Sequence, residues 1–402
     1  MIFERYCVGL IAIMYSLIIK IQPKKLVAAQ IVSKEVYKHT QINLQIYRHG
    51  HSSLESSFLK YDKYQDYSWP TPLNELTQKG FLQQRRLGQR ILHRYSQNHQ
   101  LINKSYHKND ILIRSTIIKR ALDSARANLL GIFPNHRSSI IFEDNLSSYN
   151  SSLIPIFTKL SKKDSLLDSR YECPKYKKLF SDRLNTPEFL KFNKSLEPLY
   201  LYLTKHANEP IRDILKLKRY YMNVYNEKKY FNLSQPEWVD KSFLEVERAI
   251  NNSLNYIYGG SSDVIGLPQD KELLKYESGE LIERIINHFK RKSEGERCEK
   301  LVIFASHDDA TLYKLSNLLG SKDNILNSKG LIDYSASIIF ELWRNKHMHY
   351  FIKILSADNA FSPFRVVTQF VNGCDEEICS FDNFEKANQM YFQNSCNRNC
   401  KS

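Results

Sequence analysis

The amino-acid sequence predicts an α/β fold, a mixed and mostly parallel sheet with flanking helices and an inserted, mainly helical cap domain. Three short apolar segments each run into polar residues and are followed by a helical pattern. This order of strand, polar turn and helix is typical of an open parallel sheet. The long middle of the chain has helical patches and few strand signals, which indicates a second, mainly helical unit.

The first 30 residues are expected to be a signal peptide. Arg5 precedes the apolar run Tyr6–Ile19, which is long enough for the apolar part of a secretion signal and short for a membrane span. Ala28 and Ala29 offer a cleavage point near Gln30. An uncleaved N-terminal anchor is the alternative, because lysines follow the apolar run. We therefore predict a secreted, extracellular protein with no stable membrane span after signal removal.

The cysteines also favour export. Cys7 would leave with the signal peptide, and an even number of cysteines would remain, which is typical of disulfides in an oxidising compartment. Their spacing, without accompanying histidines, argues against a zinc site. Several Asn-x-Ser sites suit a glycosylated chain. The remaining cysteines are Cys173, Cys298, Cys374, Cys379, Cys396 and Cys400.

The formal net charge of +15 favours anionic partners. The lysines and arginines are scattered, however, and their longest runs are short. A solvated basic surface is therefore preferred to a specific nucleic-acid site. A basic surface that binds polyanions such as heparin or nucleic acid stays open as a further reading.

The first part of the α/β domain is predicted over residues 31–150 and contains two of the three strands. Leu44–Tyr47 runs into Arg48-His49-Gly50, and Ile111–Ile113 runs into Arg114-Ser115-Thr116.

The helical cap is predicted over residues 151–296. The second part of the α/β domain, residues 297–402, is expected to have a disulfide-bonded C-terminus. Its strand, Leu301–Ala305, runs into Ser306-His307-Asp308.

The polar residues at the three strand ends form a candidate phosphate site: Arg48, His49, Arg114, His307 and Asp308. The carboxyl ends of parallel strands meet at one crevice. Two arginines can bind the oxygens of a phosphate, and a neutral histidine can attack phosphorus. A second histidine can donate to the anion, and an aspartic acid can protonate the leaving oxygen if its pKa is raised. Each pair alone is commonly structural, but the set together indicates phosphate chemistry.

Several motifs resemble those of the histidine acid phosphatases. Tyr47-Arg48-His49-Gly50 is similar to the R-H-G-x-R-x-P motif of that family, and Ile113-Arg114-Ser115-Thr116 resembles its R-S-T-D region. Ser306-His307-Asp308-Asp309-Ala310 resembles its H-D motif. The similarity covers nearly all of the mature chain in the same order, and it implies an α/β domain with a helical cap.

The resemblance implies a role for each strand-end residue. His49 falls at the position of the nucleophile that becomes phosphohistidine, and Asp308 at the position of the proton donor. Arg48, Arg114 and His307 fall at phosphate-binding positions. No metal and no cofactor are needed.

The resemblance also implies disulfides. Cys374 would pair with Cys379, and Cys173 with either Cys396 or Cys400. Cys298 is an additional cysteine, and the remaining C-terminal cysteine is its candidate partner.

The chain departs from the family motif at Ser52, where the family has a second arginine. One charge-assisted donor to a transferring phosphoryl group is typically worth about 10²–10³ in rate. Phosphatase activity is therefore expected to be low or absent. His51 is a candidate partial substitute at the ligand site, because a protonated imidazole donates hydrogen bonds at acidic pH.

Catalytically disabled, secreted relatives of this kind occur in the saliva of blood-feeding arthropods. The resemblance therefore implies a pseudoenzyme that binds small host mediators, biogenic amines or leukotriene-like carboxylates, in the former active-site pocket. The alternative is an active acid phosphomonoesterase that acts through a phosphohistidine intermediate. The expected partner is a small-molecule ligand or a phosphate monoester, no specific nucleic acid is expected, and a homodimer is left open.

Overall fold

The computed structural model describes residues 37–54, 63–64, 66–136, 154–168, 171–327 and 330–393. The predicted signal peptide and the cysteines at 396 and 400 lie outside these residues. Within them, no helix is long and apolar enough to cross a membrane.

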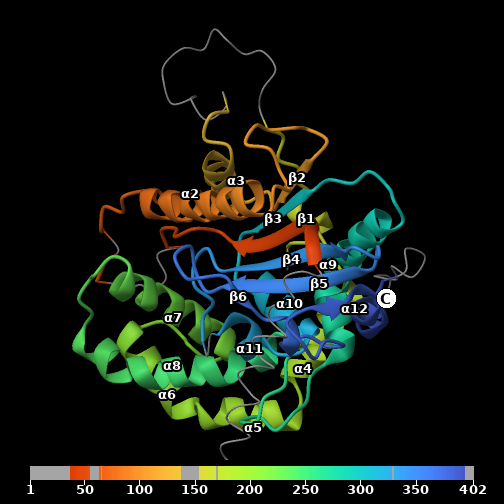
Figure 1. Cartoon of the computed structure of the whole chain (residues 1–402). Helices are drawn as coiled ribbons and strands as arrows, with labels where there is room; N and C mark the ends of the chain where they lie inside the picture. The colour runs from red at the N-terminus through yellow and green to blue at the C-terminus, as the bar shows by residue number, and fades with distance from the viewer. Residues whose placement is uncertain are drawn as a thin grey trace, which may run out of the picture.

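A seven-stranded sheet lies at the centre of the molecule (Figure 1). Its strands run in the order β2-β3-β1-β4-β5-β6, and β7 pairs with β5. The strands are β1 (Tyr37–Arg48), β2 (Ile111–Ser115), β3 (Leu301–Ser306), β4 (Ser337–Asn345), β5 (Tyr350–Ala357), β6 (Arg365–Val366) and β7 (Cys379–Ser380).

The mixed sheet with flanking helices is confirmed, and its parallel part is smaller than predicted. Only the pairs β2–β3 and β3–β1 are parallel among the paired strands of the described residues. The strands from β4 onward pair antiparallel. The reason lies in the connections: a short link between β4 and β5 can only reverse the chain direction, whereas parallel neighbours need a long crossover.

Helices α2 (Gln78–Leu92) and α3 (Lys119–Ile132) cover one face of the sheet (Figure 1). Thr77 caps α2, because its side chain accepts a hydrogen bond from the amide of Gly80. Apolar side chains of both helices pack on alternate residues of the strands, including Tyr47 and Ile113. These helices thereby hold the segments that follow β1 and β2.

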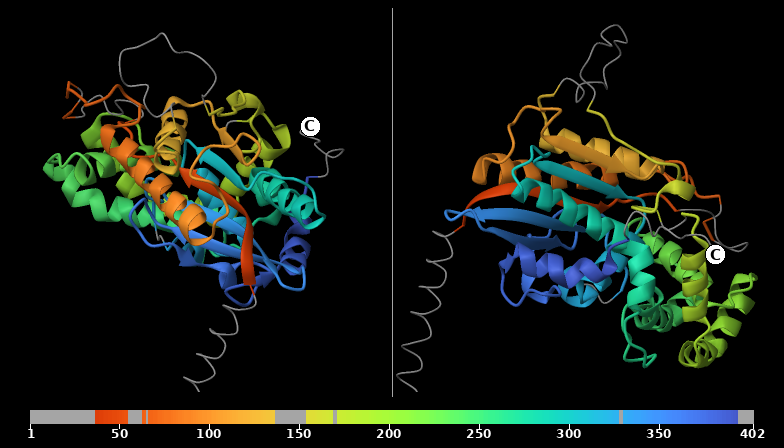
Figure 2. Two further views of the ribbon diagram at one scale, coloured as in Figure 1. Left: turned by 45° about the horizontal axis from the view of Figure 1, so that its top comes forward. Right: turned by 90° about the vertical axis from the view of Figure 1, so that its right-hand side faces the viewer.

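The opposite face carries α10 (Ala310–Leu319), α9 (Lys271–Ser293) and a larger group of helices that precede β3 (Figures 1 and 2). The helical group comprises α4 (Pro174–Leu184), α5 (Pro187–Ser195), α6 (Glu197–Ala207), α7 (Ile214–Lys229) and α8 (Glu237–Ile257). One continuous hydrophobic core joins it to the sheet, from Ile46 of β1 through Leu312 to Leu217 of α7. The boundaries proposed for the cap, 151–296, stay a prediction. The short helix α11 (Lys322–Leu326) and α12 (Phe381–Asn388) complete the fold.

The cysteines follow the prediction in part. Cys374 and Cys379 form a disulfide. Cys173 is also disulfide-bonded, and its partner lies outside the described residues. Cys298 is a free thiol, so the expectation that it forms a disulfide is wrong. Its side chain packs in the large hydrophobic core beneath the sheet, and no other cysteine of the described residues is bonded to it.

Helices α2 and α3 approach each other closely at two glycines. A Cβ added at Gly88 would overlap the carbonyl oxygen of Asn128, and one added at Gly131 would overlap the carbonyl oxygen of Arg85. The two helix backbones therefore leave no room for a side chain at this crossing.

We expect Gly88→Ala to lower the free energy of unfolding by about 1–3 kcal/mol, because the added methyl group forces the two helices apart. Leu82→Ala, on the exposed side of the same helix, is the control and should change it by less than about 0.5 kcal/mol. Urea unfolding followed by circular dichroism, with the disulfides intact, measures both. Equal stability of Gly88→Ala and the native protein would contradict the close packing.

Candidate active site

The ends of β1 and β3 lie side by side. Arg48 is opposite Ser306 in the parallel register of these strands. The amide of His49 donates to the carbonyl oxygen of Ser306 at 3.0 Å, and the amide of Ser335 donates to the carbonyl oxygen of His49 at 3.0 Å. Backbone hydrogen bonds on both sides thus fix His49 next to the segment that carries His307.

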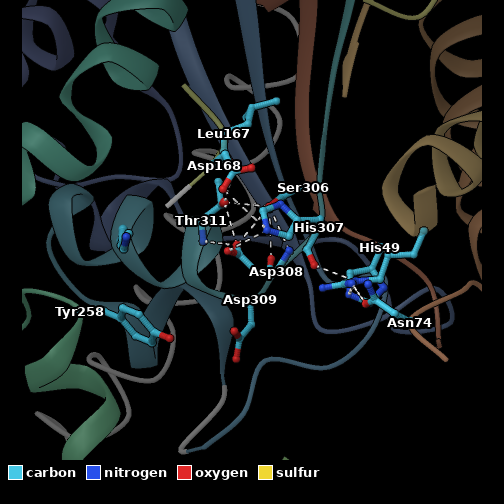
Figure 3. Close-up of polar contacts among 12 residues, drawn as sticks. His49, Asn74, Leu167, Asp168, Tyr258, Ser306, His307, Asp308, Asp309 and Thr311 are labelled. Carbon is cyan, nitrogen blue, oxygen red and sulfur yellow. Dashed lines mark hydrogen bonds and ion pairs between the residues drawn. The ribbon is translucent and has the colours of Figure 1, made fainter. Parts of the chain in front are cut away.

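A cleft of about 550 Å³ opens at these strand ends. Four of the predicted residues line it: Arg48, His49, His307 and Asp308. The side chains come from both parts of the predicted α/β domain, as Figure 3 shows for His49 and the His307–Asp308 group. Lys218 and Tyr258, from the helical group, form the opposite wall.

The hydrogen bonds of His49 define its tautomer. Its Nδ1 lies 2.6 Å from the carbonyl oxygen of Gly50, which can only accept, so Nδ1 carries the proton. Arg120 Nε lies 3.1 Å from His49 Nε2 and can only donate, so Nε2 presents its lone pair. Burial, and then the positive charges of Arg120 and Arg48, hold the pKa of His49 well below its usual value. The imidazole is therefore neutral, and its unprotonated Nε2, which accepts from Arg120 in the free cleft, is the nitrogen that can act as a nucleophile once Arg120 donates to a ligand instead.

Arg120 is a functional residue that the sequence reasoning missed. Its Nε also donates to the carbonyl oxygen of His307 at 3.0 Å, and its Nη1 contacts Asn74 Oδ1. The residue is 4% exposed and lines the cleft. One signal was present in the sequence: Arg120 lies at the start of a helical pattern, where a cation opposes the helix dipole and so needs a specific reason to be there.

Arg48 lies at the floor of the cleft. Its Nη1 donates to the carbonyl oxygen of Ile332, and its guanidinium stacks 4.2 Å from the centre of the Tyr334 ring. Its Nε is buried and has no hydrogen-bond partner within the described residues. A buried N–H of a charged group without an acceptor is costly. An oxyanion in the cleft would supply that acceptor.

Asp308 is tied to the start of α10. Its Oδ1 accepts hydrogen bonds from the amide and the hydroxyl of Thr311, at 3.2 and 3.1 Å (Figure 3). Its Oδ2 lies 3.6 Å from His307 Nε2, which is also 3.9 Å from Asp168 Oδ1. Burial raises the pKa of Asp308, but the positive charges of His307 and Lys314 and the Thr311 amide outweigh it and lower the pKa overall. Asp308 is therefore ionised in the free cleft.

The structure does not bring Arg114 to the cleft. Its Nη2 forms an ion pair with Asp164 Oδ2 at 2.7 Å, and its Nη1 donates to the carbonyl oxygens of Ser115 and Phe157. Arg114 is absent from the cleft lining, whereas Arg120, six residues further on, is part of it. Of the arginines that line the cleft, Arg48 is the chain neighbour of His49 and Arg120 contacts its Nε2, while Arg219 is a third.

The structure also keeps His51 and Ser52 out of the cleft lining. His51 Nδ1 lies 2.7 Å from Thr77 Oγ1, and its ring packs against Tyr230. Burial, with the charges of Lys79 and Arg48, lowers the pKa of His51 to about 3. A neutral His51 cannot replace the missing arginine as a cation. Ser52 forms a β-bridge with Leu76.

The cleft is electropositive. Five cationic side chains and two carboxylates are among its lining residues within the described chain. The cations are Arg48, Arg120, Lys218, Arg219 and Lys314, and the carboxylates are Asp308 and Asp309. This balance favours anionic ligands.

Known proteins are similar to this chain in sequence and in fold. Lysosomal acid phosphatase of Homo sapiens is 30% identical over 304 residues, 74% of this chain and 66% of that protein. The rat protein of that name is 27% identical over 361 residues, 89% of this chain and 79% of that protein. Among solved structures, a phytase from Citrobacter braakii has a TM-score of 0.62 at 13% identity and covers 88% of this chain and 98% of its own.

The match to the family is nearly as long as the described chain. Residues 20–357 match the histidine phosphatase superfamily (branch 2), a range that contains both strand ends of the cleft. The acid phosphatase relatives, the shared fold and the cleft built on Arg48, His49, His307 and Asp308 agree with that match. This chain belongs to branch 2 of the histidine phosphatase superfamily.

Proposed function

We propose that this chain is a secreted, acid-phosphatase-like protein that binds phosphate monoesters in the cleft and hydrolyses them slowly through His49. The observation that carries the proposal is the buried Nε–H of Arg48, for which the described part of the chain offers no acceptor, beside a neutral imidazole whose Nε2 faces Arg120. A phosphate would give Arg48 its acceptor and would place phosphorus within reach of Nε2.

The proposed reaction has two steps. His49 Nε2 forms a bond to phosphorus while the bond to the ester oxygen breaks, and that oxygen takes a proton from Asp308. Water then attacks the phosphohistidine, gives a proton back to Asp308 and releases phosphate. Asp308 is ionised in the free cleft, so it must gain its proton when the substrate binds. A phosphate dianion nearby raises the pKa of a carboxyl group and supplies that condition.

The arginine set explains why hydrolysis should be slow. Ser52 offers no guanidinium, Arg114 is engaged with Asp164, and His51 is uncharged. The arginines next to His49 that can hold the transferring phosphoryl group are therefore Arg48 and Arg120. The loss of one such donor costs about 10²–10³ in rate.

A second candidate function is the binding of a leukotriene-like carboxylate in the same cleft. The lining combines its cations with apolar side chains, Phe180, Leu215, Met222 and Ile257, which suits an anion with an apolar body. The excess of cations disfavours biogenic amines, the other class of mediator that the sequence suggested.

We expect slow release of phosphate from an aryl phosphate, abolished by His49→Ala because no nucleophile remains. His347→Ala, which changes an exposed histidine outside the cleft, is the matched control and should retain the native rate. Initial rates from about pH 4 to pH 8 measure both. Turnover that survives His49→Ala would refute the proposal. No turnover, together with micromolar binding of a leukotriene-like carboxylate by calorimetry, would favour the second candidate.

We expect kcat/KM to rise as the pH falls from about 7 to about 5. The lowered pKa of His49 keeps the nucleophile neutral in this range, and Asp308 becomes easier to protonate. A rate that falls with a midpoint near the ordinary histidine pKa of about 6.5 would contradict this.

The role of Asp308 can be isolated with two substrates. Asp308→Asn should reduce hydrolysis of an alkyl phosphate by about 10²-fold or more, because a poor leaving group needs the proton. The same variant should affect an aryl phosphate, whose leaving group is good, much less. Equal losses for both esters would exclude Asp308 as the proton donor.

A further inference from the structure

Asp309 has an unusual position for a residue at the start of a helix. It is the N-cap of α10, a place where an aspartate ordinarily accepts a hydrogen bond from the first turn. Its side chain makes no such bond. Asp308, one residue earlier, accepts from the amide of Thr311 in its place. The carboxylate of Asp309 is thereby released from helix capping and lines the cleft.

Asp309 forms a buried cluster with two residues of the helical group. Lys218 Nζ lies 3.2 Å from Asp309 Oδ1 and 2.5 Å from the hydroxyl oxygen of Tyr258. Figure 3 shows the Tyr258 hydroxyl turned toward the carboxylate of Asp309. The Asp309 residue is 2% exposed, and the side chains of its partners also line the cleft.

One oxygen of this cluster lacks a donor. Asp309 Oδ2 is buried and has no hydrogen-bond partner within the described residues. A carboxylate oxygen accepts hydrogen bonds only, and leaving it unpaired in a buried place is costly. Asp309 lines the cleft, so a small turn of its side chain would bring this acceptor within reach of a ligand donor, and the unpaired Nε–H of Arg48 has the same relation to a phosphate.

The cluster adjoins the proposed proton donor in the chain. Asp308 is the proposed donor to the ester oxygen, and Asp309 is the next residue in the chain, with its carboxylate turned away from the His307–Asp308 group (Figure 3). Groups that contact Asp309 should therefore belong to the alcohol part of the ester rather than to its phosphate. This placement rests on the function proposed above.

We propose that Asp309, held by Lys218 and Tyr258, is a specificity site for phosphate monoesters whose alcohol carries a second hydroxyl group near the ester oxygen. The hydroxyl donates to Asp309 Oδ2, and its own oxygen can accept from the neighbouring Lys218. An ammonium group fits less well, because Lys218 already compensates the carboxylate and the cleft has an excess of cations. The substrate class is thus a polyol phosphate.

Binding without turnover tests the site directly. The protein with His49→Ala is titrated by calorimetry with 2-hydroxyethyl phosphate and with n-propyl phosphate, which has the same shape but lacks the hydroxyl. We expect the hydroxyl ester to bind about 10- to 100-fold more tightly, the effect of a hydrogen bond to a buried charged group. Equal dissociation constants would overturn the inference. Tighter binding of 2-aminoethyl phosphate than of the hydroxyl ester would overturn the choice of substrate class.

Variants then assign the preference to the cluster. Asp309→Leu alone would leave Lys218 buried without its partner, so it is combined with Lys218→Met, which replaces the pair with apolar side chains of similar size. In this double variant the hydroxyl ester and n-propyl phosphate should bind with about equal dissociation constants. The control exchanges the exposed pair Lys228–Asp240 in the same way, Lys228→Met with Asp240→Leu, and should keep the full preference. A preference that persists in the Asp309 variant would refute the assignment.

The outcomes separate the two proposals. If neither ester binds to the His49→Ala protein and the native protein releases no phosphate from any ester, the proposed function fails and the specificity site fails with it. If both esters bind equally and are hydrolysed, the function stands and the specificity site alone is refuted.

Discussion

The parallel pairing of β1 with β3 is the constraint on which the cleft depends. The register sets Arg48 opposite Ser306, and the amide of His49 continues the ladder to the Ser306 carbonyl oxygen. A slip of one residue would turn every side chain of β1 to the other face of the sheet. It would move Ile42, Leu44 and Ile46 out of the large core and put buried polar residues such as Asn43 and Gln45 in their place. The geometry of the nucleophile is thus secured by the same contacts that stabilise the fold.

Electrostatics inside the cleft follow from burial as much as from charge. Burial keeps His49 neutral, and the neighbouring arginines reinforce that effect. For Asp308, burial and the surrounding positive charges oppose each other, and the charges prevail. His49 therefore presents a lone pair to a region where Arg120 and Arg48 concentrate positive potential. Such an arrangement holds the nucleophile ready without requiring a proton to be removed from it.

Short strands and their polar ends were predictable because a buried strand and its turn are local in sequence. Arg48, His49, His307 and Asp308 meet in one cleft for this reason. Which of Arg114 and Arg120 enters the cleft could not be predicted from the sequence. It depends on the direction of the two side chains relative to Asp164 and His49. The antiparallel half of the sheet and the free Cys298 were likewise set by tertiary packing, which no short window of sequence reveals.

The core beneath the sheet is continuous with the core of the helical group, from Ile46 to Leu217. The helical group cannot rotate away from the sheet without separating the close-packed apolar contacts that the two share. Widening the cleft by moving the helical group would therefore cost the free energy of the apolar contacts that this group shares with the sheet. Selection among ligands then depends on the dimensions and the charge that the cleft already has.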